Sequence, residues 1–176
     1  LEDETSMATY SVGGLILSNS GMITSNYWLS EVYDAQITNA HKNGDLYIHN
    51  INMLTGCSAG WSLEDLILKG LPSVNKMISS LPAKHLSTLC NQMVNFLGIM
   101  QNEWAGAQAF SSFDTYLAPF VKVDNLSYPE VKKCIESFIY GVNTPSRWGT
   151  QAPFSNITLD WTVPDDLAEL PAIVGG

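Results

Sequence analysis

The sequence predicts a helix-rich α/β fold, and three observations support this. Apolar residues recur at helical spacing in several stretches, most clearly from about 83 to 104. Two short stretches, 46–49 and 156–161, instead have the composition or the alternation of strands. These strands are far apart in the sequence, which favours parallel pairing through helical crossovers. We expect one continuous unit over 1–176, without internal repeats or a low-complexity linker.

The first part of the chain is expected to form two helices, a turn and a strand, over 5–20, 24–41, 43–45 and 46–49 respectively. The run Asn19-Ser20-Gly21 is the expected end of the first helix. Thr24 or Ser25 is the expected cap of the second helix, because their hydroxyl oxygens accept from free backbone N–H groups.

The remainder is expected to be mainly helical, with helices over 62–70, 83–104, 106–121 and 128–141, followed by the strand at 156–161. Capping-box patterns open two of these helices, at Ser62-Leu63-Glu64-Asp65 and at Ser127 with Glu130. Gly70-Leu71-Pro72 is expected to close the shorter one.

The composition favours a chain whose surface is largely covered. Only 14% of the residues are charged while 45% are hydrophobic, whereas soluble domains carry about 25% charged residues. More of the same polypeptide or a partner subunit would account for the difference. The first residue, Leu1, is not an initiator Met, and the last residues form neither a helix nor a charged tail. We therefore interpret the chain as a segment of a longer protein.

The net charge of −9 argues against binding to nucleic-acid polymers or anionic lipid, which need clustered bases. A small nucleotide needs only a few local donors and is not excluded. No apolar run reaches the length of a membrane span, and no secretory signal is apparent. A cytoplasmic location is expected.

Cysteine and histidine usage favours reduced thiols and no metal site. Three cysteines without close spacing form a poor disulfide framework and a poor zinc site. The three histidines form no His-x-x-x-His pair. Cys90 and Cys134 lie in apolar helical stripes and are interpreted as structural.

The densest motif runs from Asn143 to Asn156 and contains the only arginine of the chain. Arg147 is suited to pair with oxyanions, and Trp148 or Phe154 offers a face for stacking. Prolines and a glycine stiffen the same stretch. The composition predicts a loop that approaches a polar, partly planar ligand.

Cys57 is the candidate chemical group, because small residues surround it in Gly56-Cys57-Ser58-Ala59-Gly60-Trp61. It follows the predicted strand at 46–49, and the carboxyl ends of strands are the usual site positions in α/β folds. The alternative is a buried thiol without chemistry. His49 is a candidate ligand contact or a structural histidine. The stretch 101–109 alternates small residues with amides, which suits a ligand, a partner helix or a packed helix junction.

Four segments of the chain, in order, resemble the anaerobic (class III) ribonucleoside-triphosphate reductases. They are Ala40 to Asn50, Gly56 to Trp61, Gln101 to Pro119, and Asn143 to Asp160, the last containing Asn-Thr-Pro-Ser-Arg-Trp-Gly-Thr-Gln-Ala-Pro-Phe-Ser-Asn-Ile-Thr. Together they are distributed over residues 40–160 of the 176-residue chain. The resemblance implies a segment of the catalytic domain, the N-terminal part of a ten-stranded α/β barrel in a homodimer.

The resemblance also implies reduction of ribonucleoside triphosphates through a glycine-centred radical and a cysteine thiyl. In the family a cysteine gives a proton to the departing 2′ hydroxyl, and Cys57 is the nearest match. The substrate-binding candidates are Ser58, His49, Asn143, Ser146, Arg147, Trp148, Gln151, Phe154 and Asn156. The family further implies structural zinc, formate or a thiol reductant, ATP and dNTP effectors, and a radical-SAM activating protein.

Departures from the family pattern are informative. The family places its cysteine at the position of Ser58, and an aspartate is commoner at Asn50. The thiyl cysteine, zinc cysteines, radical glycine and ATP-cone have no counterpart in this sequence, so no activity is expected of the segment alone. The helix over 83–104 is the expected dimer and effector surface. The alternatives are a non-catalytic nucleotide-binding or dimerisation module of a split protein, and a glycyl-radical enzyme of the pyruvate formate-lyase kind.

Overall fold

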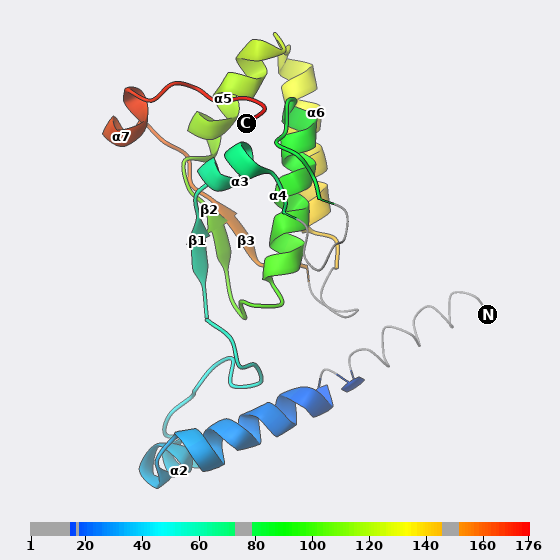
Figure 1. Ribbon diagram of the computed structural model, residues 1–176. Helices are drawn as coiled ribbons and strands as arrows, with labels where there is room; N and C mark the ends of the chain where they lie inside the picture. The colour runs from blue at the N-terminus through cyan, green and yellow to red at the C-terminus, as the bar shows by residue number, and fades with distance from the viewer. Residues whose placement is uncertain (1–14, 17, 73–78, 146–151) are drawn as a thin grey trace, which may run out of the picture.

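The computed structural model describes residues 15–16, 18–72, 79–145 and 152–176. An elongated arm formed by the first helices projects from a body in which helices pack against a small sheet (Figure 1). The described part of the chain is therefore helix-rich α/β, as the sequence predicts.

The sheet has three short parallel strands in the order β1-β2-β3: β1 Ala59–Trp61, β2 Gln108–Phe110 and β3 Ser155–Ile157. Their middle residues Gly60, Ala109 and Asn156 form one row across the sheet. The chain passes through helices between consecutive strands, which confirms the expected parallel pairing through helical crossovers.

The strand positions partly contradict the prediction. Residues 46–49 are not a strand, and β2 forms inside the stretch expected to be helical over 106–121. The third strand ends at Ile157 rather than at 161. Each observed strand has only three residues, so pairing with a neighbour decides its conformation more than its own composition does.

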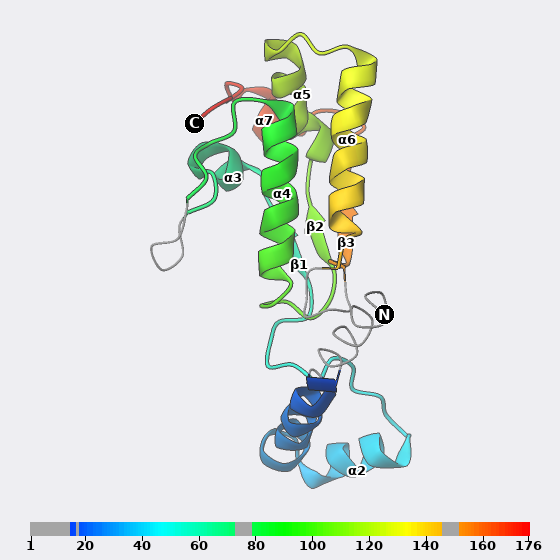
Figure 2. The ribbon, with the colours of Figure 1, turned by 90° about the vertical axis from the view of Figure 1, so that its right-hand side faces the viewer.

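Five helices belong to the body: α3 Glu64–Lys69, α4 Leu86–Met100, α5 Phe113–Val123, α6 Tyr128–Val142 and α7 Asp165–Ala168. The long helices α4 and α6 stand side by side along one face of the sheet (Figure 2). The predicted helices over 62–70 and 83–104 are confirmed with shorter bounds, and the one predicted over 128–141 is confirmed and extends to Val142.

The caps explain where these helices begin. One carboxylate oxygen of Glu130 accepts from the backbone N–H of Ser127 at 2.8 Å and from its hydroxyl at 2.6 Å, which lowers the pKa of Glu130. The capping box at α6 is confirmed. At α3 the Ser62 hydroxyl accepts from the Glu64 N–H, but Asp65 pairs with Lys69 instead of returning to the cap. Gly70 ends α3, as predicted.

The arm differs most from the prediction. Residues 18–27 are helical and continue into a π-helical turn, η1 Trp28–Val32, before α2 Ala35–Asn43. The expected break at 19–21 is wrong, because the hydroxyls of Thr24 and Ser25 donate to carbonyls one turn earlier within a continuous helix. The break falls at Tyr33 and Asp34, where the Asp34 carboxylate accepts from the Ile37 N–H at 2.9 Å.

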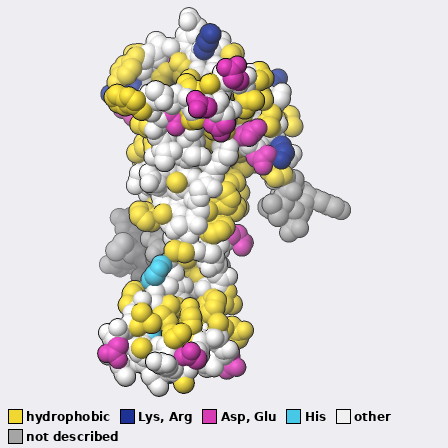
Figure 3. Space-filling view, turned by 90° about the vertical axis from the view of Figure 1, so that its left-hand side faces the viewer, with side chains coloured by type: hydrophobic (Ala, Val, Ile, Leu, Met, Phe, Trp, Pro, Cys, Tyr) yellow, Lys and Arg dark blue, Asp and Glu magenta, His cyan; other side chains and the backbone are white. Residues whose placement is uncertain are grey.

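Many apolar side chains of the arm are exposed, and they gather over its surface at the lower end of the molecule (Figure 3). They include Leu15, Ile16, Met22, Ile23, Tyr27, Val32, Leu46 and Tyr47. The predicted turn at 43–45 closes α2 with Gly44 at φ +84°, a left-handed conformation suited to glycine. None of the helices in the described residues is both long and apolar enough for a bilayer.

The core lies between the sheet and the helices, and it contains a buried amide. Gln108 of β2 is fully buried; its Oε1 accepts from the Trp61 indole N–H at 3.1 Å, and its Nε2 donates to the Leu97 carbonyl at 3.3 Å. Around it pack fully buried apolar residues, including Leu89, Met93, Leu97, Phe110 and Phe120. The amide therefore ties β1, β2 and α4 together.

We expect Gln108→Leu to destabilise the chain by about 1–2 kcal/mol, since the partly buried Trp61 indole N–H loses its acceptor and the Leu97 carbonyl keeps only the Gln101 N–H. Urea unfolding followed by tryptophan fluorescence measures the change. Gln36→Leu, at an exposed position of α2, is the matched control and should stay within about 0.5 kcal/mol. Equal midpoints for both variants would contradict the structural role of Gln108.

Candidate functional site

A cavity of about 640 Å³ lies where the chain enters the three strands. Residues just before β1, β2 and β3 line it, together with two residues from the end of the arm: His49, Asn50, Cys57, Ser58, Gln101, Ala105, Gly106, Ala107, Ala152 and Phe154. Segments more than a hundred positions apart in the sequence, at His49 and Phe154, therefore meet at one place.

The cavity is at the opposite edge of the sheet from the expected one. Cys57 precedes β1 by two residues, so it lies at the amino end of a strand rather than beyond a carboxyl end. The expectation is wrong because it depended on a strand at 46–49, which does not form.

Backbone pairing fixes the position of Cys57. The carbonyl of Gly56 accepts from the Ala105 N–H at 2.9 Å, and that of Cys57 accepts from the Gly106 N–H. The Ala59 N–H then donates to the Ala107 carbonyl at 3.0 Å. The pairing between β1 and β2 thus continues outward past the end of the strands and forms the floor of the cavity.

The Cys57 thiol is exposed and has polar neighbours. Its Sγ lies 3.6 Å from the Ser58 hydroxyl oxygen and 3.9 Å from Nδ2 of Asn50. The same Asn50 nitrogen lies 3.1 Å from Nδ1 of His49. The thiol, a hydroxyl, an amide and an imidazole therefore form one connected group within the cavity.

The structure brings together four of the predicted site residues and separates two others. Cys57, Ser58, His49 and Phe154 all line the cavity. Asn143 instead caps its own helix, donating to the Ile139 carbonyl at 2.7 Å, and borders a groove on α6.

Asn156 lies in β3, outside the cavity lining, in the row that it forms with Gly60 and Ala109. The neighbours of the row residue in β2, Gln108 and Phe110, are buried on the helix-covered face, and those in β1 and β3 are partly buried. Because side chains alternate along a strand, the row faces the other side of the sheet. Asn156 is therefore separated from the Cys57 cavity and sits on a face of small side chains. The predicted contacts Ser146, Arg147, Trp148 and Gln151 lie outside the described residues.

The stretch 101–107 contributes as many lining residues to the cavity as the predicted site residues do. Gln101, Ala105, Gly106 and Ala107 all border the cavity. The alternation of small residues with amides in the sequence indicated this wall, because small side chains leave the backbone accessible to a ligand. Asn50 is a further lining residue, and its only sequence signal was the departure from the commoner aspartate.

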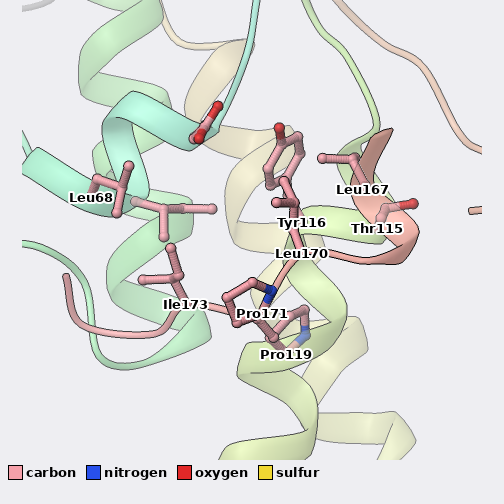
Figure 4. Close-up of a pocket in the computed structure, with 11 residues that line it drawn as sticks. Leu68, Thr115, Tyr116, Pro119, Leu167, Leu170, Pro171 and Ile173 are labelled. Atoms are coloured by element: carbon pink, nitrogen blue, oxygen red, sulfur yellow. The ribbon is translucent and has the colours of Figure 1, made fainter. Parts of the chain in front are cut away.

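A second, smaller pocket of about 120 Å³ lies on the carboxyl side of the sheet. Apolar side chains from α3, α5 and the C-terminal residues converge on it, including Leu68, Pro119, Leu170 and Ile173 (Figure 4). It contains no cysteine or histidine. Of the two pockets, the larger one at the amino ends therefore holds the reactive groups.

The other two cysteines are placed for packing. Cys90 is buried in α4 and Cys134 is partly buried in α6. Burial, with a smaller contribution from nearby Cys134, raises the pKa of Cys90 from 9.0 to about 12. Among the described residues, no group of three or more His, Cys, Asp or Glu side chains is placed to hold a metal ion.

We expect iodoacetamide at neutral pH to modify Cys57 readily and Cys90 only after unfolding, because the thiolate is the reactive form. Between pH 9 and about 12 the unfolded chain releases the Cys90 proton while the folded chain retains it. Stability should therefore fall as the pH rises above 9. Peptide mapping by mass spectrometry, with and without urea, checks the order of labelling. Labelling of Cys90 at the rate of Cys57 in the folded chain would contradict the assignment.

Comparisons with known proteins agree on one family. Residues 4–173 match the family described as anaerobic ribonucleoside-triphosphate reductase. The anaerobic ribonucleotide reductase from Thermotoga maritima in complex with dATP and CTP is 25% identical, with a TM-score of 0.59 over 87% of this chain and 26% of that chain. Another structure, described as anaerobic ribonucleotide reductase, is 26% identical, with a TM-score of 0.61 over 79% of this chain and 24% of that chain.

The chain thus spans about a quarter of the length of these solved structures. No curated protein matches its sequence.

Proposed function

The chain belongs to the anaerobic ribonucleoside-triphosphate reductase family, and on this premise we propose that it forms one wall of a ribonucleotide-reducing active site. The observation that carries the proposal is the cavity in which an exposed thiol meets residues that precede all three strands. The remaining walls would come from residues outside this chain, in a ten-stranded barrel of which β1, β2 and β3 would be one part.

The cavity chemistry fits a ribose. The Cys57 thiol, the Ser58 hydroxyl and the His49 imidazole line the cavity, and such groups hydrogen-bond sugar hydroxyls. Phe154 is 74% exposed and lines the same cavity, so its ring is available to stack on a planar ligand. One of the similar structures is described as holding dATP and CTP, and we extend ribonucleotide binding to this chain.

Cys57 would act as the proton donor. The radical chemistry of the family supplies removal of the 3′ hydrogen, from groups that lie outside this chain. The S–H proton of Cys57 would then pass to the 2′ hydroxyl, whose carbon–oxygen bond breaks with its electron pair as water leaves. A thiol within hydrogen-bond reach is suited to this general-acid step. Formate or a thiol reductant would supply the electrons.

Arg147 is the proposed contact to the triphosphate, since its guanidinium forks toward phosphate oxygens. Ser146, Gln151, Asn143 and Trp148 are proposed to assist it. A homodimer with nucleotide effectors and a radical-SAM activating protein is proposed for the complete enzyme, with α4 at the dimer surface.

Ribonucleotide protection of Cys57 tests the proposal. In the complete enzyme, a saturating ribonucleoside triphosphate should slow iodoacetamide labelling of Cys57 by about ten-fold or more, because bound sugar would cover the thiol. Labelling of Cys134 is the internal control and should not change. Equal labelling of Cys57 with and without nucleotide would remove the substrate pocket from this cavity. Protection without turnover would favour a nucleotide-binding module.

A further inference from the structure

We propose that Asn50 is a positioning residue that holds the Cys57 thiol in the cavity through its side-chain amide. The inference rests on the proposed function, because it assigns a partner to the thiol that would give the proton. It starts from the conformation of Asn50 and from the two contacts of its amide nitrogen.

Asn50 has a backbone conformation that few residue types adopt. Its φ of +56° lies in the left-handed region, where asparagine and glycine are favoured over other residues. This turn places the side chain over the cavity, where Asn50 and Cys57 are both lining residues despite seven positions of separation. The sequence here therefore permits a conformation that aims the amide at the thiol.

The amide nitrogen has two hydrogens, and the structure offers an acceptor for each. Nδ2 lies 3.1 Å from Nδ1 of His49 and 3.9 Å from Sγ of Cys57. An amide nitrogen only donates, so Nδ1 of His49 must be the acceptor and its proton must be on Nε2. His49 thereby orients the amide, and the second N–H is directed to the sulfur.

This arrangement suits a thiol that releases a proton. After the S–H bond breaks and the new O–H bond forms, the negative charge remains on Sγ. The Asn50 N–H then donates to a sulfur anion, and hydrogen bonds to charged groups are stronger than those between neutral groups. An aspartate at this position could not donate in its ionised form. Asn50 thus acts through Cys57 and need not contact the nucleotide.

Two substitutions distinguish the contribution of the Asn50 side-chain amide from that of its backbone conformation. Asn50→Gly retains the left-handed conformation without a side chain, and Asn50→Asp retains the shape but replaces the donor by a carboxylate. Asn125 is the matched control, because it is exposed and also left-handed, with φ +50°, but lies away from the cavity. Asn125→Gly and Asn125→Asp should behave like the parent.

The experiment measures iodoacetamide labelling of Cys57 in the complete enzyme at neutral pH, residue by residue. We expect labelling to slow by about two-fold with Asn50→Gly, because the sulfur loses its N–H donor, and by about five-fold with Asn50→Asp, because a carboxylate beside the sulfur opposes the negative charge of the reacting form. Labelling of Cys134 should not change. Parent-like labelling in both Asn50 variants would overturn the proposal.

A second readout is independent of thiol reactivity. In the reductase assay, both Asn50 variants should lower kcat while KM for the ribonucleotide changes little, because the amide serves the proton donor rather than binding. A rise in KM at constant kcat would overturn the positioning role. Should the enzyme prove not to reduce ribonucleotides at all, the labelling rates would still decide whether Asn50 controls Cys57.

Discussion

Replacing Cys57 by alanine in the complete enzyme is expected to lower the rate of ribonucleotide reduction by about a thousand-fold, the usual worth of a positioned proton donor. Nucleotide affinity should change little, because the thiol is one of several groups lining the cavity. Turnover and equilibrium binding of a ribonucleoside triphosphate, measured on the same preparation, check both parts.

Cys134→Ala is the control, since Cys134 lies on α6 outside the cavity lining. The double variant Cys57→Ser with Ser58→Cys tests whether the thiol can act from the neighbouring position, because the sulfur of Cys57 and the hydroxyl oxygen of Ser58 are only 3.6 Å apart. Recovery of turnover in the exchanged variant would show that either position serves. Full activity of Cys57→Ala would reject the proton-donor role.

The second large effect is expected at Gly106. A Cβ there would lie 2.6 Å from the Cys57 carbonyl oxygen and 3.0 Å from the Ser58 hydroxyl oxygen. The closer obstacle is backbone and cannot rotate away, so Gly106→Ala should push the Cys57 segment outward. We expect a loss of about 2–3 kcal/mol in the free energy of unfolding, typical of overpacking. In the complete enzyme, turnover should fall with it.

Gly60→Ala is the matched control, because a Cβ at Gly60 meets no atom within 4 Å and the residue lies in the neighbouring β1. Its unfolding free energy should stay within about 1 kcal/mol of the parent, with any change toward greater stability. Urea unfolding of both variants provides the comparison. Equal urea-unfolding midpoints for Gly106→Ala and Gly60→Ala would mean that the Cys57 segment moves aside at little cost in free energy.

The long helices could be predicted because their signals are local. The stripe of Leu89, Met93 and Leu97 repeats over several turns of α4, and all three are fully buried. Ser127 and Glu130 specify the start of α6 within four residues. These features depend on neighbours in sequence, so no knowledge of the fold was needed.

The strands could not be predicted, because their conformation depends on partners far away. Residues 108–110 lie in a stretch rich in glycine and alanine. They form the strand β2 only because they pair with β1 on one side and with β3 on the other. Residues 46–49 show the converse. Tyr47 is 80% exposed, and the Ile48 N–H donates to the His41 imidazole instead of to a strand.

The sequence indicated which residues line the cavity better than it indicated where the cavity lies on the sheet. Cys57, Ser58, His49 and Phe154 were chosen from local composition and resemblance, and they share one cavity. The prediction that the site lies beyond a carboxyl end of a strand was wrong, because it depended on a strand at 46–49 that does not form. Asn50 was not a candidate, because its link to Cys57 arises only when the chain folds back over seven positions.

The outer margins of the sheet have a practical consequence. In the described part of the chain, β1 and β3 each pair on one side only. Unpaired strand edges of this kind can pair with strands of other chains and so promote association. When the polypeptide is produced by itself, self-association along these strand edges is expected, and a dimer seen under such conditions would report strand addition rather than the proposed subunit contact. Assembly is therefore best measured after co-expression with the rest of the enzyme.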